Sequence, residues 1–283
     1  MKIILLLVSL FPVLFATAQT QDSLFVWKAG VLLHKQSIKP SDMDSITFKR
    51  PITPNGINIP GPNVTDIDGN TYQSVSNCRQ TWTKQNLNVS KYSDGTLIPQ
   101  ITDTTQWQNL TTGAWCYINN KTANGPIYGK LYNWYAVMGI YDAASAANPV
   151  LRKKLAPTGW HIPSDAEWSN LINCLDPKAD GGNKLPNVAG GKMKAVGIYP
   201  STGLWYVTNI GATNESGFTG LPGGALTDSN SIGYIGLYGN WWSSSEYDTT
   251  KAWSRTLSTV DGTINRVYFH NKNSCFSVRC VKD

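Results

Sequence analysis

The sequence predicts an α+β fold with two helices, long glycine-rich loops and a strand-rich C-terminus. Three observations support this prediction. An amphipathic helix with signals at both ends is recognisable over residues 165–175, glycines are dense after Gly181, and the C-terminal residues alternate as strands do. Helical and strand patterns in separate stretches of one chain are typical of the α+β class.

The first residues have the three parts of a cleaved signal peptide. Lys2 precedes an apolar run over residues 3–15, and small residues follow at Ala16-Thr17-Ala18. The run is shorter than the roughly 20 apolar residues that cross a bilayer, which argues against a membrane anchor. We therefore expect residues 1–18 to be removed. The mature protein would start near Gln19, be secreted or lie at the cell surface, and have no membrane span.

A small β-rich segment is expected next, over residues 19–48. Residues 24–27 and 31–35 are β-prone and flank a short turn, which predicts a hairpin, and a third β-prone run covers 45–48. Residues 49–63 contain four prolines among glycine and asparagine, a composition that excludes helix and central strand. This stretch is predicted to be an extended linker, and the main domain is expected from residue 64 to 283.

The clearest helix of the main domain begins at a Ser-x-x-Glu sequence. Ser164 can cap the first turn, and Glu167 can bond back to the backbone N–H of the cap. Apolar residues then recur at the spacing of one helix face, at Trp168, Leu171, Ile172 and Leu175. Asp176-Pro177 ends this helix. The same spacing predicts a second helix over residues 131–138.

The C-terminal part of the chain is predicted to form strands. After Gly181 the glycines are too closely spaced for long helices. Stretches with strand-like alternation then follow at residues 241–245, 252–257, 264–269 and 276–281.

The composition excludes several classes of protein. Charged residues make up only 15% of the chain, whereas Trp (11), Tyr (13) and Gly (25) are abundant. This mixture argues against a disordered chain and suits a loop-rich extracellular fold. The net charge of +6 comes from scattered basic residues, and the only run of three is Arg152–Lys154. We therefore expect no nucleic-acid partner.

Neither a metal site nor a cofactor is expected. The five cysteines include no Cys-x-x-Cys pair, and the three histidines are far apart in the sequence. Asp66, Asp68 and Asn70 resemble the start of a calcium loop, but no glutamate follows at its twelfth position. A tight turn between strands is the favoured interpretation.

Two positions offer weak evidence for catalysis. His161 precedes the capped helix and is close in sequence to Asp165 and Glu167, which would permit acid–base chemistry. A structural histidine bonded to the backbone is favoured over that. Glu246 follows three serines, but the chain has no Gly-x-Ser-x-Gly elbow. No catalytic residue is therefore assigned.

Aromatic residues among the glycine-rich loops are the best binding candidates. Most tryptophans must belong to the core, because burial of large rings dominates core energetics. A ring in a glycine-rich loop has fewer strands to pack beneath it, so we expect a partly exposed face that stacks on sugars or on a partner protein. The candidates are Trp205, Tyr206, Tyr234, Tyr238 and Trp241.

A series of motifs occurs in one order along the main domain. They include Asp66-Ile-Asp-Gly-Asn-Thr-Tyr72, Gln80-Thr-Trp-Thr-Lys-Gln-Asn-Leu87, Trp115-Cys-Tyr-Ile-Asn-Asn120, Tyr128-Gly-Lys-Leu-Tyr-Asn-Trp134, Pro157-Thr-Gly-Trp-His-Ile-Pro-Ser-Asp-Ala-Glu-Trp168, Gly211-Ala-Thr-Asn-Glu-Ser-Gly-Phe218, Trp242-Ser-Ser-Ser-Glu246 and Phe276-Ser-Val-Arg-Cys280. The series resembles the Fibrobacter succinogenes major paralogous domain over residues 64–283. The resemblance implies a secreted or surface protein of a Bacteroidetes-type bacterium, and it supplies no reaction.

The predicted layout is also similar to the C-type-lectin-like fold, including its formylglycine-generating-enzyme variant. The Glu-Pro-Asn and Trp-Asn-Asp calcium motifs of sugar-binding lectins are absent from the sequence. A counterpart of the copper-binding cysteine pair of formylglycine-generating enzymes is also missing. The similarity therefore implies an architecture and no particular activity.

The family resemblance also bears on the cysteines. Cys116 and Cys280 lie inside family motifs, and a bridge between them would tie the last strand to the body of the domain. Cys78 and Cys275 stand where the family pattern has glycine, which suggests a second bridge between them. Cys174 would then be a free thiol at the border of the apolar helix face.

We expect a non-enzymatic extracellular binding or interaction domain for glycans or envelope proteins. An extracellular enzyme acting on glycans or proteins, and a purely structural envelope component, are the alternatives. These differ in one observable feature. An enzyme should gather groups with perturbed pKa values in a cleft, whereas a binding face should carry aromatics and amides.

Overall fold

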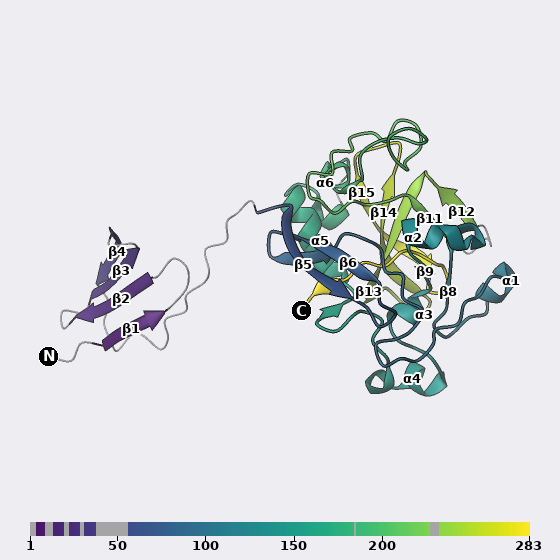
Figure 1. The fold of residues 1–283 in the computed structure, drawn as a ribbon, viewed down its shortest axis with the longest axis horizontal. Helices are drawn as coiled ribbons and strands as arrows, with labels where there is room; N and C mark the ends of the chain where they lie inside the picture. The colour runs from purple at the N-terminus through teal and green to yellow at the C-terminus, as the bar shows by residue number, and fades with distance from the viewer. Residues whose placement is uncertain are drawn as a thin grey trace. The chain divides into compact units, whose positions relative to one another are not determined.

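The computed structural model describes residues 56–183, 185–226 and 232–283, and the backbone of four earlier strands (Figure 1). The chain divides into two compact units, Met1–Ile52 and Thr53–Asp283. In the first unit, β1 (Ile4–Val8), β2 (Leu14–Gln19), β3 (Ser23–Lys28) and β4 (Val31–Ser37) form an antiparallel sheet in chain order.

Strands β3 and β4 are the predicted hairpin, and they pair antiparallel. Strands β1 and β2 occupy most of the segment for which the sequence predicts a signal peptide, and the removal of that segment stays a prediction. The third β-prone run, at residues 45–48, lies outside the described residues.

The first sheet of the second unit joins the beginning and the end of that unit. Its strands are β5 (Ile59–Thr65), β6 (Thr71–Asn77), β7 (Gln80–Thr83), β10 (Trp160–His161) and β16 (Val281–Lys282), in the order β10-β16-β7-β6-β5. The predicted linker is thus too long, because β5 begins inside residues 49–63. Prolines are tolerated in β5 because it is an edge strand, where an N–H need not join a ladder.

The second sheet contains most of the predicted C-terminal strands. It consists of β11 (Gly223–Leu226), β12 (Ile232–Ile235), β13 (Tyr238–Glu246), β14 (Lys251–Ser258) and β15 (Ile264–Asn271), in the order β12-β11-β13-β14-β15. The pair β11–β13 is parallel and the others are antiparallel. The strands predicted at 241–245, 252–257 and 264–269 are confirmed.

The strand predicted over residues 276–281 is mostly wrong. Only Val281 and Lys282 form a strand, and the residues before them make isolated bridges to three different segments, Cys275 to Leu226, Phe276 to Tyr132 and Ser277 to Trp241. The alternation here does not mark a half-buried strand, because the polar residues Ser277 and Arg279 are buried together with the apolar ones.

The capped helix is confirmed as α5 (Asp165–Leu175). Ser164 and Glu167 make both bonds of the capping box, and Trp168, Leu171, Ile172 and Leu175 are buried. The other helices are short: α1 (Thr104–Trp107), α2 (Gly125–Tyr128), α3 (Trp134–Val137), α4 (Ala143–Ala147) and α6 (Ala189–Met193). Single 3-10 turns cover Ile118–Asn120, Thr122–Asn124, Pro149–Leu151 and Asp180–Gly182.

The second predicted helix begins later than expected. Residues 131–132 form β9 (Leu131–Tyr132), which pairs with β8 (Trp115–Cys116), and only Trp134–Val137 are helical. Asn133 causes the change. Its side-chain oxygen accepts from the backbone N–H of Ala136 (2.9 Å) and from that of Ala114 (3.0 Å), which starts the helix at Trp134 and fixes the strand before it.

Four buried rings connect α5 to both sheets. The ring of Trp168 on α5 lies 4.7 Å from that of Trp82 on β7 and 5.7 Å from that of Phe218. Phe218 in turn lies 5.8 Å from Trp241 on β13. All four residues are fully buried, so this cluster is the centre of the core between helix and sheets.

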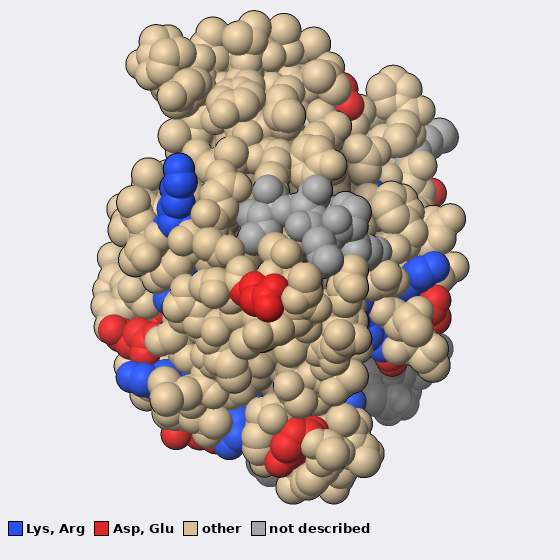
Figure 2. All heavy atoms as spheres, turned by 90° about the vertical axis from the view of Figure 1, so that its right-hand side faces the viewer, with Lys and Arg blue, Asp and Glu red and all other residues tan. Residues whose placement is uncertain are grey.

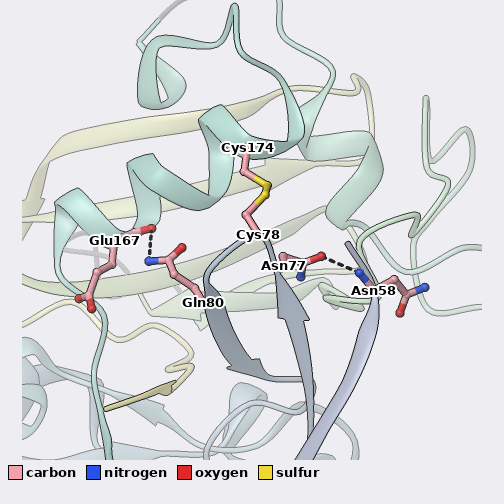
Figure 3. Close-up of a disulfide and its surroundings, with 6 residues drawn as sticks. All are labelled: Asn58, Asn77, Cys78, Gln80, Glu167 and Cys174. Atoms are coloured by element: carbon pink, nitrogen blue, oxygen red, sulfur yellow. Dashed lines mark hydrogen bonds between the residues drawn. A yellow bond between two sulfur atoms is a disulfide. The ribbon is translucent and has the colours of Figure 1, made fainter. Parts of the chain in front are cut away.

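One disulfide, Cys78–Cys174, ties the β6–β7 hairpin to α5 (Figure 3). The Cα atoms are 6.5 Å apart, within the usual range for a bridge. Beside it, the side-chain amide of Gln80 donates to the backbone carbonyl of Glu167 (3.0 Å), so hairpin and helix are joined at two points.

The predicted pairings Cys116–Cys280 and Cys78–Cys275 are therefore wrong, and Cys174 is not the free thiol. Cys116, Cys275 and Cys280 are buried and free. Cys116 and Cys275 share one apolar cluster, where their thiols are hydrogen-bonded, whereas Cys280 lies in another. Cys174 lies at the border of the apolar face of α5. The hairpin turn that contains Cys78 docks at this border, so Cys174 is paired there.

Reduction of the protein should lower the free energy of unfolding by up to about 4.7 kcal/mol, because a bridge between residues 96 positions apart restricts the unfolded chain. Non-reducing peptide mapping should recover Cys78 joined to Cys174. Thiol reagents should reach the other three cysteines only after unfolding. As a control, the stability of a double variant with alanine at both bridge positions should not change when reductant is added. A disulfide-linked peptide pair containing Cys116 and Cys280 would contradict the assignment.

Candidate functional site

A groove with a volume of about 530 Å³ crosses one face of the second sheet. Strands β11 to β15 and the C-terminal segment supply its walls. The lining residues are Ala225, Tyr234, Tyr238, Asn240, Thr256, Asn265, Arg266, Val267, Phe269, His270 and Phe276. Concave sites of this size, with an apolar floor and a few fixed polar groups, are typical of ligand-binding sites.

A polar row crosses the groove from strand to strand. Asn240 on β13 pairs with Thr256 on β14, which pairs with Asn265 on β15, so the three side chains lie on one face of the sheet. The hydroxyl of Thr256 donates to the side-chain oxygen of Asn240 (2.8 Å), and the Asn240 amide nitrogen donates to the carbonyl of Gly224 (3.2 Å). These bonds fix the orientation of the Asn240 amide.

The floor of the groove is apolar and rigid. Ala225, Val267 and Phe276 are buried beneath the polar row. The ring of Phe276 packs 4.4 Å from that of Trp242 and 4.7 Å from that of His270. Because these rings belong to the core, the floor is preformed.

Two of the predicted aromatic candidates form the rim. Tyr234 on β12 and Tyr238 on β13 are 47% and 38% exposed, and their ring centroids are 5.8 Å apart. Tyr234 has a φ of +65°, a left-handed conformation that is uncommon for a bulky residue. Backbone strain of this kind gathers at functional sites.

The expectation that Trp205 and Trp241 are exposed is wrong, since both are fully buried. The indole N–H of Trp205 donates to the carbonyl of Gly220 (3.1 Å), and that of Trp241 to the side-chain oxygen of Asn86 (2.9 Å). The glycines explain the difference. A Cβ on Gly239 would lie 2.4 Å from the Trp241 ring and one on Gly220 would lie 3.3 Å from it, so backbone without side chains covers the ring directly.

Tyr206 is exposed but lies outside the groove. It is 40% exposed, and its ring packs on Gly236 and lies 5.5 Å from the ring of Tyr199. Of the five candidates, the structure therefore brings only Tyr234 and Tyr238 into the groove lining; Tyr206 lies against the turn between them, and Trp205 and Trp241 are in the core.

His161 contacts two carboxylates, whereas a bond to the backbone was expected. Its Nδ1 lies 2.6 Å from a carboxylate oxygen of Asp283, and its Nε2 lies 2.7 Å from one of Glu167. Burial by itself lowers the pKa of His161, but the bonds to Asp283 and Glu167 outweigh burial and raise the pKa. Since both nitrogens are engaged, the arrangement stabilises the fold and leaves no nitrogen for a substrate.

Stability should fall as the pH rises through the raised pKa of His161. The folded-state pKa lies above the unfolded value of about 6.5, so the protonated ring stabilises the fold fully below that value and loses the effect as it deprotonates. His161→Gln should remove this part of the pH dependence. Urea unfolding of both proteins at roughly pH 6 and pH 9 tests this, and identical pH profiles would contradict it.

The other polar candidates of the sequence stabilise local structure. The carboxylate of Asp66 accepts from the backbone N–H groups of Asp68 (2.9 Å) and Asn70 (3.0 Å), which confirms the tight turn between β5 and β6. Glu246 forms an ion pair with Lys272. The hydroxyl of Ser245 accepts from the N–H of Asp165 at the start of α5 (2.9 Å).

Charge does not mark out another site on the face of the molecule drawn in Figure 2, where acidic and basic side chains are scattered and interspersed. Within the residues that the structure describes, no group of His, Cys, Asp and Glu is placed to hold a metal ion. No helix in that part of the chain is long and apolar enough to span a membrane.

The family profile of the Fibrobacter succinogenes major domain matches residues 75–282. The chain belongs to this family. No curated protein and no solved structure matches it. The match begins inside β6 and ends in β16, so the family domain contains α5, the second sheet and the groove.

Several buried cations of the family domain were missed by sequence reasoning, among them Arg279 and Lys194. Arg279 lies in the Phe276–Cys280 motif, and Lys194 follows α6; both are fully buried. No acidic residue adjacent in sequence to Arg279 or Lys194 would suggest that the cation is buried and paired. The groove residues on β15 did have a signal, because Asn265 and Val267 alternate along a predicted strand and so share one face.

Proposed function

We propose that this protein is an exported, non-enzymatic binding domain whose groove takes a glycan, and that its architecture is C-type-lectin-like. The observation that carries the proposal is the combination of Tyr234 and Tyr238 on the rim with the amides of Asn240 and Asn265 inside the groove. Sugars present flat C–H faces, which pack on aromatic rings, and hydroxyl groups, which bond to amides.

The chemistry of the groove favours binding over catalysis. No acidic side chain lines it among the residues that the structure describes, and the amide of Asn240 is already fixed by its neighbours. A hydrolase of glycans would need a pair of carboxylates facing the ligand. Aromatics and amides were the features expected of a binding face.

Two further features support the export and architecture parts of the proposal. A disulfide is typical of proteins that fold in an oxidising compartment. The last strand β16 pairs with β7 near the start of the second unit, and a long loop region separates α5 from the second sheet, an arrangement that resembles C-type-lectin-like domains. N-terminal sequencing of the exported protein should find a start near Gln19.

The binding test uses the purified mature protein and linear polysaccharides: cellulose, xylan, mannan, chitin and peptidoglycan. Pull-down and calorimetry should detect binding to at least one of them. Tyr234→Ala and Tyr238→Ala should each weaken that binding by roughly tenfold, because a stacked aromatic contributes about 1 kcal/mol or more.

Tyr141→Ala is the matched control, because Tyr141 is 37% exposed and lies outside the groove. It should bind as the unaltered protein does. The proposal fails if none of the polysaccharides binds, or if the rim variants bind as well as the control.

A further inference from the structure

A second cluster of aromatic rings lies at the edge of the same sheet. It consists of Tyr247, Trp253, Tyr268 and Phe269, and we call it the edge platform. Tyr247, Tyr268 and Phe269 are 47%, 48% and 59% exposed. Their rings are in contact, with centroids 4.9 Å apart for Tyr247–Tyr268 and 6.0 Å for Tyr268–Phe269. Exposed apolar clusters of this kind mark interaction sites more often than isolated exposed rings do.

A β-bulge in the edge strand β15 produces the platform. Ser254 pairs with Val267 and Ala252 pairs with His270, so Tyr268 and Phe269 together oppose the single residue Trp253. In a regular strand two successive side chains would point to opposite faces. The bulge turns both rings toward the same edge, which is how bulges at sheet edges re-aim side chains.

The platform is held rigidly from beneath. The guanidinium carbon of Arg266 lies 3.6 Å from the centroid of the Trp253 ring, and Arg266 is bonded to both carboxylate oxygens of Asp165 at the start of α5. Trp253 is therefore the support, and Tyr247, Tyr268 and Phe269 form the open surface. A preformed surface loses little entropy on binding.

Phe269 belongs to the groove and to the platform at once. It lines the groove, and its ring contacts that of Tyr268. Strand alternation places Thr256 and Asn265 on the groove side of the sheet and Trp253 on the opposite side, so Phe269 on the edge strand joins the groove to the platform around the edge of the sheet. Simple protection of an edge strand would use charges, proline or a short strand, whereas β15 has eight residues and exposes aromatic rings here.

We infer that groove and platform together bind one linear glycan of several sugar units, which leaves the groove over the edge of the sheet at Phe269. The inference rests on the proposed glycan-binding function and adds the length of the ligand. A terminal sugar or a disaccharide would occupy the groove alone. A longer chain would also lay its next units on Phe269 and Tyr268.

The experiment uses the dimer, tetramer and hexamer of the polysaccharide that binds in the screen, titrated by calorimetry. The hexamer should bind at least tenfold more tightly than the dimer. The single variants Tyr268→Ala and Tyr247→Ala should each bind the hexamer about tenfold more weakly than the unaltered protein does. Their affinity for the dimer should be unchanged. Tyr234→Ala should lower the affinity for both dimer and hexamer, and Tyr141→Ala should change neither affinity.

The outcomes separate this inference from the proposed function. Equal affinities for dimer and hexamer, or a hexamer affinity that neither platform variant changes, overturn the inference while groove binding stands. Absence of binding to every polysaccharide overturns both. Circular dichroism of each variant checks that the fold is kept. Tyr268 lies on β15 and Tyr247 follows β13, so one local disruption cannot account for both effects.

Discussion

Arg279→Met is expected to leave too little stability for the domain to stay folded at neutral pH. The guanidinium is fully buried and packs 4.3 Å from the centre of the Phe218 ring. It donates to four oxygens: the carbonyls of Thr83 (2.6 Å), Phe218 (3.0 Å) and Thr219 (3.1 Å), and the side chain of Asn86 (2.7 Å). Burial lowers the pKa of Arg279 to about 9, so the group is still charged at pH 7.

The size of the effect follows from the acceptors that would be left without a donor. The Asn86 oxygen keeps the indole N–H of Trp241 as a donor, so three backbone carbonyls are left unpaired. Each buried, unpaired acceptor costs roughly 1 to 3 kcal/mol, and three of them approach the roughly 5 to 15 kcal/mol that stabilises a whole domain. The bonds also join β7, the 218–219 loop and the C-terminal segment, so their loss separates three parts of the core.

Urea unfolding followed by tryptophan fluorescence measures this effect. Arg79→Met is the matched control, because Arg79 is exposed, and its stability should stay within about 0.5 kcal/mol of the unaltered protein. Arg279→Lys should be intermediate, since an ammonium keeps the charge but cannot reach four acceptors. A folded Arg279→Met protein with an unchanged midpoint would refute the role assigned to Arg279.

Lys194→Met should have the second largest effect, a loss of about 3 kcal/mol or more. The ammonium is fully buried and donates to the carbonyls of Ile210 (2.7 Å), Ser258 (2.9 Å) and Asp261 (2.7 Å). Burial lowers its pKa to about 8, while the three carbonyl acceptors favour the charged form. Methionine keeps the length of the side chain and supplies no donor.

Lys194→Met should weaken the packing of one loop as well as lower the free energy of unfolding of the whole domain. Lys194 holds the loop that contains Ile210 against the turn between β14 and β15, so hydrogen exchange over residues 195–214 should become faster in Lys194→Met. Lys192→Met is the control. Its ammonium lies 3.7 Å from Glu215 at the surface, and such a pair contributes at most about 1 kcal/mol. Equal exchange rates in the two variants would contradict the assignment.

These two buried cations bear on where a ligand can bind. Both hold glycine-rich loops in place through backbone carbonyls, and Trp205 and Trp241 are buried beneath the same loops. Two of the five aromatic candidates, Trp205 and Trp241, are in this way part of the core. Of the other three, Tyr206 is exposed outside the groove, and Tyr234 and Tyr238 are exposed at its rim.

Features set by neighbouring residues were predictable from the sequence. Helix α5 has its cap, its apolar stripe and its stop signal within thirteen residues of one another, and each acts over a few positions. Three strands of the second sheet were visible for the same reason, because alternation is a local property. The family was also recognisable, since its motifs are short contiguous stretches, and the matching profile confirms it.

The tertiary structure alone decided which residues meet. Cys78 pairs with Cys174 because the hairpin turn docks on α5, and no spacing of cysteines contains that information. Trp241 is buried while Tyr238, three positions earlier, is open, because Tyr238 stands at the first position of β13, whereas other elements pack on both faces of the strand from residue 239 to residue 243. Whether a residue is buried or paired depends on residues that are distant in sequence and pack against it. A single sequence does not show which distant residues these are.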